Sequence, residues 1–231
     1  MKKKNEREGE VELINKTVLD ESLQNGHYTI VLQNIRENVP ESETYIPIIE
    51  ALFTCLKLRD VATAEHSILM AYYTIQLARI HDIDNADMYF IGSLTHDIGK
   101  LAMSDSILKG NKRLTTEERK SLSQHAIDGE ELLKKLNMPQ LIIEIASIHH
   151  ERYDGSGYPL GLIGKEIPLS GRITAITDTF ATLIGGRPYQ KSKNKEEAMS
   201  VMKENEHLFD SVILNSFNEL INSKQLSCLL P

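Results

Sequence analysis

The sequence contains little cysteine and no long apolar run. Its two cysteines in 231 residues, Cys55 and Cys228, exclude a disulfide-rich scaffold, and their separation does not fit a thiolate-held metal site. No stretch approaches the roughly 18 apolar residues of a membrane span, and the basic start MKKKNEREGE is not followed by the apolar core of a signal peptide. We therefore expect a cytoplasmic protein with reduced thiols and no membrane partner.

The sequence also lacks an excess of positive charge. Its net charge is −7, and acidic and basic residues are mixed along the chain, which argues against a binder of nucleic-acid polymers. A local cluster of lysine and arginine could still attract a small phosphate-bearing ligand, because surface charges act over about 8 Å at physiological salt. With 41% hydrophobic residues, the chain can bury one substantial core.

The alternation of apolar and polar residues that marks strands is missing, and apolar residues recur instead at helical spacing. The pattern predicts helices over residues 48–58, 66–80, 86–100, 115–136, 141–150, 171–184, 195–205 and 210–223. We therefore predict an all-α fold, a compact helical bundle. Prolines at 40 and 47 divide the chain into two parts. The N-terminal segment, 1–45, is predicted to be partly flexible or helical, and the main domain is predicted to span 46–231.

Three local features refine these helices. The first helix is predicted to bury a face made of Ile48, Leu52, Cys55 and Leu56. Thr115 and Glu118 stand at the spacing of a capping box, which places a helix start there. Ser170 is the predicted cap of the helix over 171–184.

Seven ligand-type side chains fall on predicted helices or helix ends beside apolar residues. They are His66, His96, Asp97, His125, His149, His150 and Asp178. A single such side chain is usually a hydrogen-bonded core residue, and an ionised carboxylate on an apolar helix is unfavourable without a cation or a donor. One or two divalent metals would satisfy all seven together. Imidazole and carboxylate ligands suit iron, manganese and zinc.

Four of these seven residues form two pairs of neighbours in the sequence. Neighbours on a helix point about 100° apart, so His96 with Asp97, and His149 with His150, can each chelate from one helix edge. Asp97 can then bridge two ions. The turn-rich residues that follow in HHERYDGSGYP (149–159) stop the helix at the second pair.

The order of these residues resembles the HD superfamily of metal-dependent phosphohydrolases. HHERYDGSGYP resembles the motif of its HD-GYP branch, whose members hydrolyse cyclic-di-GMP. The resemblance covers roughly residues 50–215 and includes LTHDIGKLAMSDSILKG (94–110), GYPLGLIGKEIPLSGRITAITDTF (157–180) and GGRPYQ (185–190). It implies a bundle of the HD-domain type, with the HD-GYP-type phosphohydrolase domain at 46–231.

The resemblance also implies a binuclear centre. One metal would be held by His66, His96, Asp97 and Asp178, and the second by Asp97, His125, His149 and His150. Iron or manganese is expected, with zinc and nickel as alternatives. Two ions about 3.5–4 Å apart can generate hydroxide near neutral pH and hold a phosphate for in-line attack, so Asp97 is a predicted catalytic residue.

Further roles follow from the same resemblance. Lys100, one turn beyond Asp97, would contact a phosphate oxygen or the departing alkoxide, although a surface lysine is the alternative. The remaining predicted substrate contacts are Gly157, Tyr158, Pro159, Arg187 and Tyr189, where the glycines and proline could equally form a plain sharp turn. Asp60 and Asp154 are predicted to support the site through hydrogen bonds, with a helix-terminus aspartate as the alternative for Asp60.

Some positions depart from the family. Ala62 stands where some members carry a glutamate that supports a third metal, so two metals are expected. Leu69, Ala181 and Gln190 also differ from the residues common in the family, which weakens the substrate contacts. The usual sensor or receiver domain is not expected, because residues 1–45 are too short for one.

Two functions from different classes follow. The first is a phosphodiesterase that linearises cyclic-di-GMP to pGpG, with further cleavage to GMP left open. The alternative is a catalytically weak module that binds cyclic-di-GMP or docks a partner, such as a GGDEF-type protein. Docking would use the loop that contains Gly157, Tyr158 and Pro159, which we call the GYP loop. A nucleotidase or phosphatase of the wider superfamily is disfavoured because the GYP loop is complete, and a homodimer is left open.

Overall fold

The computed structural model describes residues 28–38, 40–81, 83–108, 115–185 and 192–223. Its α-helices are α2 (Tyr28–Asn38), α3 (Ile46–Arg59), α4 (Val61–Ile80), α5 (Ala86–Thr95), α6 (Asp105–Leu108), α7 (Thr116–Lys135), α8 (Gln140–Ile148), α9 (Leu169–Gly185), α10 (Lys195–Glu204) and α11 (Ser211–Asn222). Short 3-10 helices are η1 (Pro40–Thr44), η2 (Ile98–Ala102), η3 (Gly164–Glu166) and η4 (Glu206–Leu208). The described residues contain no β-strand, which confirms the all-α prediction.

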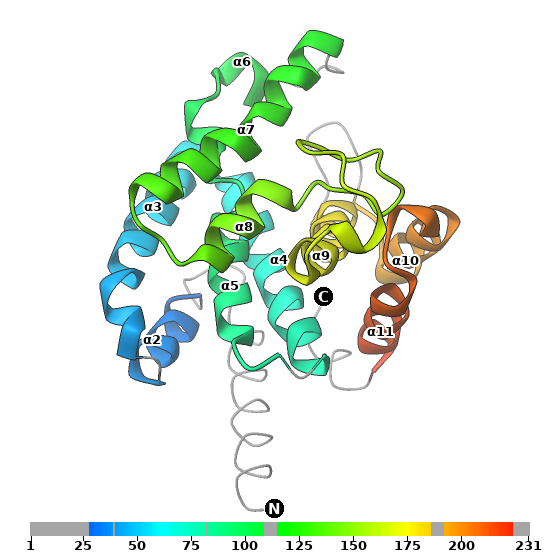
Figure 1. Cartoon of the computed structure of the whole chain (residues 1–231), viewed down its shortest axis with the longest axis horizontal. Helices are drawn as coiled ribbons and strands as arrows, with labels where there is room; N and C mark the ends of the chain where they lie inside the picture. The colour runs from blue at the N-terminus through cyan, green and yellow to red at the C-terminus, as the bar shows by residue number, and fades with distance from the viewer. Residues whose placement is uncertain (1–27, 39, 82, 109–114, 186–191, 224–231) are drawn as a thin grey trace, which may run out of the picture.

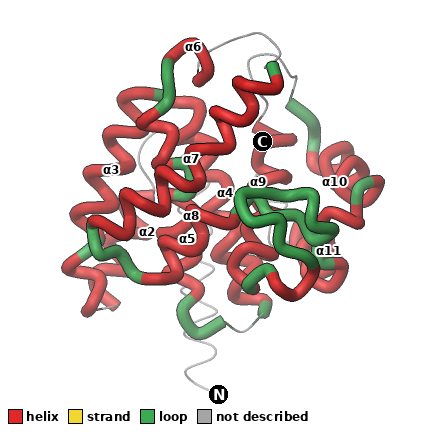
Figure 2. Tube along the Cα trace, turned by 45° about the horizontal axis from the view of Figure 1, so that its top comes forward, coloured by secondary structure: helices red, strands yellow, loops and turns green. Residues whose placement is uncertain are grey.

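The helices pack around a central group made of α4, α5, α8 and α9 (Figure 1). Helix α4 contacts α3, α5, α9 and α11, while α8 is held between α5, α7 and α9. A buried aromatic cluster joins three of them: the Tyr73 ring on α4 lies 5.1 Å from that of Phe180 on α9 and 5.8 Å from that of Phe217 on α11. The long loop after α8 lies near α9 and α11 (Figure 2).

Side-chain caps define where several helices begin. The Asp60 carboxylate accepts hydrogen bonds from the backbone of Ala62 and Thr63 and so caps α4. The predicted capping box of Thr115 and Glu118 is confirmed at the start of α7. Such caps satisfy the N–H groups that have no partner in the first turn of a helix. They place α4 and α7, which carry His66 and His125.

Two predicted helix boundaries are wrong. The helix expected over 86–100 ends at Thr95, so His96 and Asp97 lie at the junction between α5 and η2. Helix α9 begins at Leu169, so Ser170 lies inside the helix and is not its cap. The Ser170 hydroxyl instead donates a hydrogen bond to the Glu144 carboxylate on α8.

The predicted buried face of the first helix is also displaced. Helix α3 buries Ile46, Ile49, Phe53 and Leu56, whereas Cys55 is exposed. Apolar residues occur on two neighbouring stripes of this helix, and periodicity does not choose between them. The contacts of α3 with α4, α5 and η2 decide which stripe is buried.

The described part of the N-terminal segment is helical. Leu32 and Ile35 on α2, with Tyr45 after η1, are buried and belong to the hydrophobic core. Residues 1–27 lie outside the described residues, and the division between 45 and 46 stays a prediction.

A membrane-crossing helix would need a long apolar stretch. No helix among the described residues combines the length and hydrophobicity that crossing a membrane requires.

Candidate metal centre

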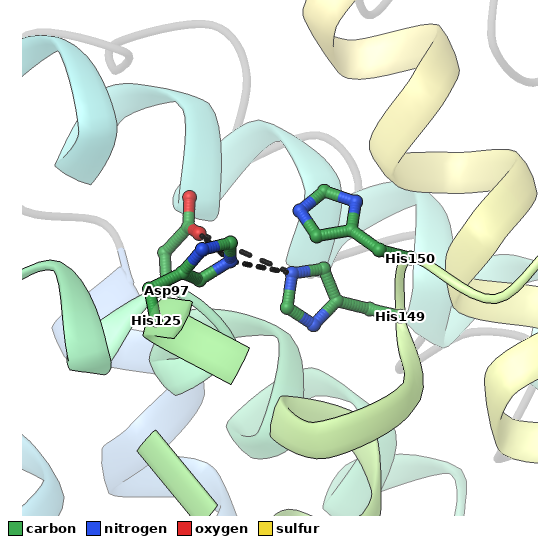
Figure 3. A group of neighbouring side chains, drawn as sticks. All are labelled: Asp97, His125, His149 and His150. Carbon is green, nitrogen blue, oxygen red and sulfur yellow. Dashed lines mark hydrogen bonds and ion pairs between the residues drawn. The ribbon is translucent and has the colours of Figure 1, made fainter. Parts of the chain in front are cut away.

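All seven predicted ligands converge at one place. Their side chains come from α4, the junction of α5 and η2, α7, the end of α8, and α9. They form two groups, Asp97 with His125, His149 and His150, and His66 with His96 and Asp178, and within each group the candidate ligand atoms lie within 4.8 Å of one another. The residues of the first group point toward one another (Figure 3).

Asp97 lies between the two groups. Its Oδ2 is 3.1 Å from His96 Nε2, and its Oδ1 is 3.2 Å from His125 Nε2 and 4.0 Å from His149 Nε2. The two carboxylate oxygens therefore face different groups. This arrangement suits a carboxylate that bridges two cations.

Asp178 connects the groups at a second point. Its Oδ1 lies 3.0 Å from His66 Nε2, and its Oδ2 lies 3.5 Å from His150 Nδ1. Helix α9 thus brings one carboxylate to imidazoles from α4 and from the end of α8.

Backbone hydrogen bonds orient three of the imidazoles. Nδ1 of His96 lies 2.7 Å from the carbonyl oxygen of Ser93, and Nδ1 of His149 lies 3.0 Å from that of Ala146. Nδ1 of His125 contacts the carbonyl of Leu122 in the same way. A carbonyl oxygen only accepts, so each Nδ1 carries the proton and each Nε2 presents a lone pair to the centre. Metal-binding histidines are commonly oriented in this manner.

Two buried atoms in the cluster lack hydrogen bonds. His96 Nε2 and Asp97 Oδ1 are inaccessible to solvent and have no hydrogen-bond partner among the described residues, although other ligand atoms lie close by. An unsatisfied buried polar atom is unfavourable by about 1–3 kcal/mol. A divalent cation would satisfy both atoms, and the set of imidazoles and carboxylates suits such an ion. The residues therefore fit a divalent-metal site.

The protonation of the ligands agrees with this fit. Although burial opposes it, the neighbouring His96 and Lys100 hold the pKa of Asp97 well below its usual range, and His66 and His150 do the same for Asp178. Burial, with repulsion from other imidazoles, holds the pKa values of His149 and His150 well below the usual value. Ionised carboxylates and neutral imidazoles are the forms that bind metals.

His96 behaves differently from the other two histidines. Burial would lower its pKa, but the attraction of Asp97 raises it above the usual value. A cation bound at His96 therefore competes with a proton for Nε2, and metal binding there should weaken as the pH falls.

These shifts predict an acid-sensitive metal-free protein. A histidine with a folded-state pKa below its unfolded value of about 6.5 takes up a proton on unfolding, so its contribution to stability is present above that pH and lost below it. His149 and His150 therefore stabilise the folded protein above pH 6.5, whereas His96, whose pKa is raised, stabilises it at lower pH. Below pH 6.5 the stabilisation from His96 is already complete, so His149 and His150 together should decrease the free energy of unfolding by about 2 kcal/mol per pH unit.

Urea denaturation of the chelator-treated protein at pH 7.5, 6.5 and 5.5 measures this decrease. His149→Gln should reduce the slope, whereas His207→Gln, at a side chain that is 63% exposed, should leave it unchanged. Equal slopes in the wild type and both variants would contradict the assigned role of the buried imidazoles.

Lys100 points back toward the cluster. Its Nζ lies 2.6 Å from Asp97 Oδ2, and its side chain is partly exposed. The ammonium group therefore sits beside the bridging carboxylate. Its predicted contact with a substrate phosphate stays a prediction.

The GYP loop packs against His150. The Tyr158 ring centroid lies 4.7 Å from that of His150, and the Tyr158 N–H donates to the His150 carbonyl. Gly157 passes so close to the start of the loop that a Cβ would lie 2.3 Å from Arg152 N, and Pro159 follows a cis peptide bond. The loop thus borders the cluster, while its predicted substrate contacts stay predictions.

Asp60 and Asp154 make hydrogen bonds outside the cluster. The hydrogen bonds of Asp60 cap α4, which corresponds to the helix-terminus alternative. Asp154 accepts hydrogen bonds from the backbone and hydroxyl of Ser156 and so shapes the turn of the loop. Arg187 and Tyr189 lie outside the described residues.

One residue of the site was missed. Glu151 directly follows the histidine pair, is completely buried, and accepts hydrogen bonds from the backbone of Leu160 and Leu162. Its position beside two predicted ligands was the available signal. Sequence reasoning could not foresee that its carboxylate faces the loop.

Comparison with known proteins agrees with this geometry. The family model described as "HD domain" matches residues 50–213. The chain is 36% identical over 180 residues to the 3'3'-cGAMP-specific phosphodiesterase 3 of Vibrio cholerae, covering 74% of this chain and 39% of that protein. It is 38% identical over 156 residues to a cyclic di-GMP phosphodiesterase of Thermotoga maritima, covering 65% of this chain and 42% of that protein.

A solved structure shares the fold. Bd1817, an HDG"Y"P protein from Bdellovibrio bacteriovorus, superposes with a TM-score of 0.62 at 17% identity, covering 94% of this chain and 78% of that one. The family match spans most of the described helices and includes all seven residues of the cluster. The chain therefore belongs to the HD-domain family, and its HHERYDGSGYP loop assigns it to the HD-GYP branch.

Proposed function

We propose that this protein is a phosphodiesterase that opens cyclic-di-GMP to the linear dinucleotide pGpG. The observation that carries the proposal is the pair of buried His/Asp groups joined by Asp97. The curated relatives named above support it, because their names assign them to cyclic-dinucleotide hydrolysis. The chain spans less than half the length of either relative, so the substrate is inferred from the shared domain.

The proposed ligand sets share Asp97. One contains His66, His96, Asp97 and Asp178, and the other contains Asp97, His125, His149 and His150. Two divalent ions, iron or manganese, would supply activation of water and neutralisation of phosphate charge.

The protein's own residues prepare the site for these ions. Carbonyl contacts at Nδ1 fix the rings of His96, His125 and His149, so little rotational freedom is lost when Nε2 binds a cation. Lys100, held beside Asp97, is placed to bind a phosphate oxygen or to stabilise the departing alkoxide. Asp97 and Lys100 are therefore the proposed catalytic residues.

The substrate contacts belong to the same proposal. Gly157, Tyr158 and Pro159 border His150 and would line one side of the bound dinucleotide, with Arg187 and Tyr189 as further contacts. Since one relative is named for 3'3'-cGAMP and another for cyclic-di-GMP, 3'3'-cGAMP is the second candidate substrate. A cytoplasmic location accords with either substrate and with the low cysteine content.

Incubation with substrate tests the function. Manganese-loaded protein and cyclic-di-GMP should yield pGpG, resolved by chromatography, and a parallel reaction with 3'3'-cGAMP ranks the two substrates. Chelator-treated protein and His149→Gln should be inactive, whereas His207→Gln should retain wild-type turnover. Tight binding of cyclic-di-GMP without any product would instead favour the alternative, a signalling module that binds the dinucleotide or docks a GGDEF-type partner.

A further inference from the structure

Glu151 is buried next to the predicted metal-ligand pair, and its carboxylate binds backbone amides of the loop that follows. Its Oε1 accepts a hydrogen bond of 2.7 Å from Leu160 N, and its Oε2 accepts one of 3.0 Å from Leu162 N. The side chain has no exposed surface, so water cannot replace either bond. Glu151 therefore connects Leu160 and Leu162, which follow the GYP residues in the loop, to the end of α8.

The loop folds back on its own beginning at the same point. A Cβ on Gly157 would lie 2.5 Å from the Cα of Glu151, so only glycine allows this approach. The next residue, Tyr158, donates its N–H to the carbonyl of His150, and its ring packs against the His150 imidazole. The position of the Tyr158 ring thus depends on how firmly the loop is closed.

The outer parts of the loop are anchored independently of Glu151. Tyr153 N donates to the carbonyl of Leu208, and Gly164 N donates to the carbonyl of Tyr153. These bonds hold the beginning and the end of the loop against the segment before α11. The stretch from Gly157 to Leu162 lies between these anchors, and Glu151 holds it from inside.

We propose that Glu151 is a positioning residue for His150. By closing the loop through the amides of Leu160 and Leu162, it presses the Tyr158 ring against the imidazole and so fixes the direction of the His150 ligand atom. The inference rests on the proposed metal-binding role of His150. His150 needs such support because, among the described residues, no backbone carbonyl holds either of its ring nitrogens as one holds Nδ1 of His149, and its Nδ1 faces Asp178.

The two-amide contact requires a carboxylate. Both of its oxygens accept, whereas an amide offers one acceptor and one N–H₂ donor, which would face a second donor at Leu160 or Leu162. Glu151→Gln keeps the size of the side chain but cannot make both bonds. Glu166→Gln is the matched control, since Glu166 accepts a hydrogen bond from Ile163 N in the same loop but is exposed to solvent.

Two measurements test the proposal without any dinucleotide. Hydrogen exchange of the metal-free protein should show faster exchange of the Leu160 and Leu162 amides in Glu151→Gln and unchanged exchange in Glu166→Gln. Titration with Co²⁺, followed by visible absorption, should then show one of the two ions bound about 10–100-fold more weakly in Glu151→Gln, with an altered spectrum. The ion held without His150 should bind as in the wild type.

The selectivity of the loss separates positioning from general damage. Rapid amide exchange with an unchanged Co²⁺ titration would overturn the proposal, and so would equal weakening of both ions. If circular dichroism shows that Glu151→Gln does not fold, Glu151→Asp takes its place, with a smaller loss at the same ion expected. A protein that binds Co²⁺ as described but hydrolyses no cyclic dinucleotide would refute the proposed function and leave this inference standing.

Discussion

Replacing Asp97 by asparagine is expected to lower turnover of cyclic-di-GMP by about 10³-fold or more. Asp97 directs one oxygen toward His96 and the other toward His125 and His149. The amide of asparagine offers a single acceptor oxygen, and its N–H₂ group would face lone pairs or a cation. The substitution also removes the negative charge that Lys100 contacts at 2.6 Å. Both groups of metal-binding side chains should therefore lose affinity for metal.

Metal content and initial rates measured on the same samples check this prediction. Asp84→Asn serves as the control, because Asp84 is exposed and lies outside the cluster. The control should bind about two ions per chain and turn over as the wild type does. Wild-type rates in Asp97→Asn would rule out the bridging role of Asp97 and with it the proposed mechanism.

Replacing Gly99 by alanine should both destabilise the protein and disturb the metal centre. Gly99 lies in η2, two residues after Asp97, where a Cβ would be 2.0 Å from the His125 carbonyl oxygen and 2.6 Å from Gly129 N. These are backbone atoms of α7, which cannot turn aside as a side chain can. Helix α7 would have to move away from η2 and carry His125 with it, away from Asp97.

The expected loss of stability is about 3 kcal/mol, at the upper end of the usual effect of overpacking. Urea denaturation measures it, and Co²⁺ titration of the folded variant should show weaker binding to the group that contains His125. Gly185→Ala is the control: Gly185 ends α9, and among the described residues outside its own helix no atom lies within 4 Å of the position of its Cβ, so stability should be nearly unchanged. Equal stabilities of the two variants would show that η2 and α7 tolerate a wider spacing.

Residue type and spacing were sufficient to predict which seven side chains gather in the cluster. Histidines and aspartates on apolar helices are rare enough that seven of them indicate a shared cation, even when they are far apart in sequence. Helical periodicity and the capping box at Thr115 likewise predicted the all-α fold, because both depend on interactions within a few residues.

The spatial details depended on contacts between helices. Local pattern could not show that Cys55 lies on the exposed side of α3, or that His96 and Asp97 follow the end of α5. Nor could it show how Asp97 divides its oxygens between two groups.

Glu151 shows most clearly what the local sequence cannot predict. Read along the chain, it is one more acidic residue after two histidines, and nothing local reveals its partners nine and eleven residues later. The sequence alone determined which chemical groups this protein carries and that they suit divalent metals. Only the tertiary structure decided which atoms face one another, because that depends on how the helices and the loop pack, and packing is a property of the whole chain.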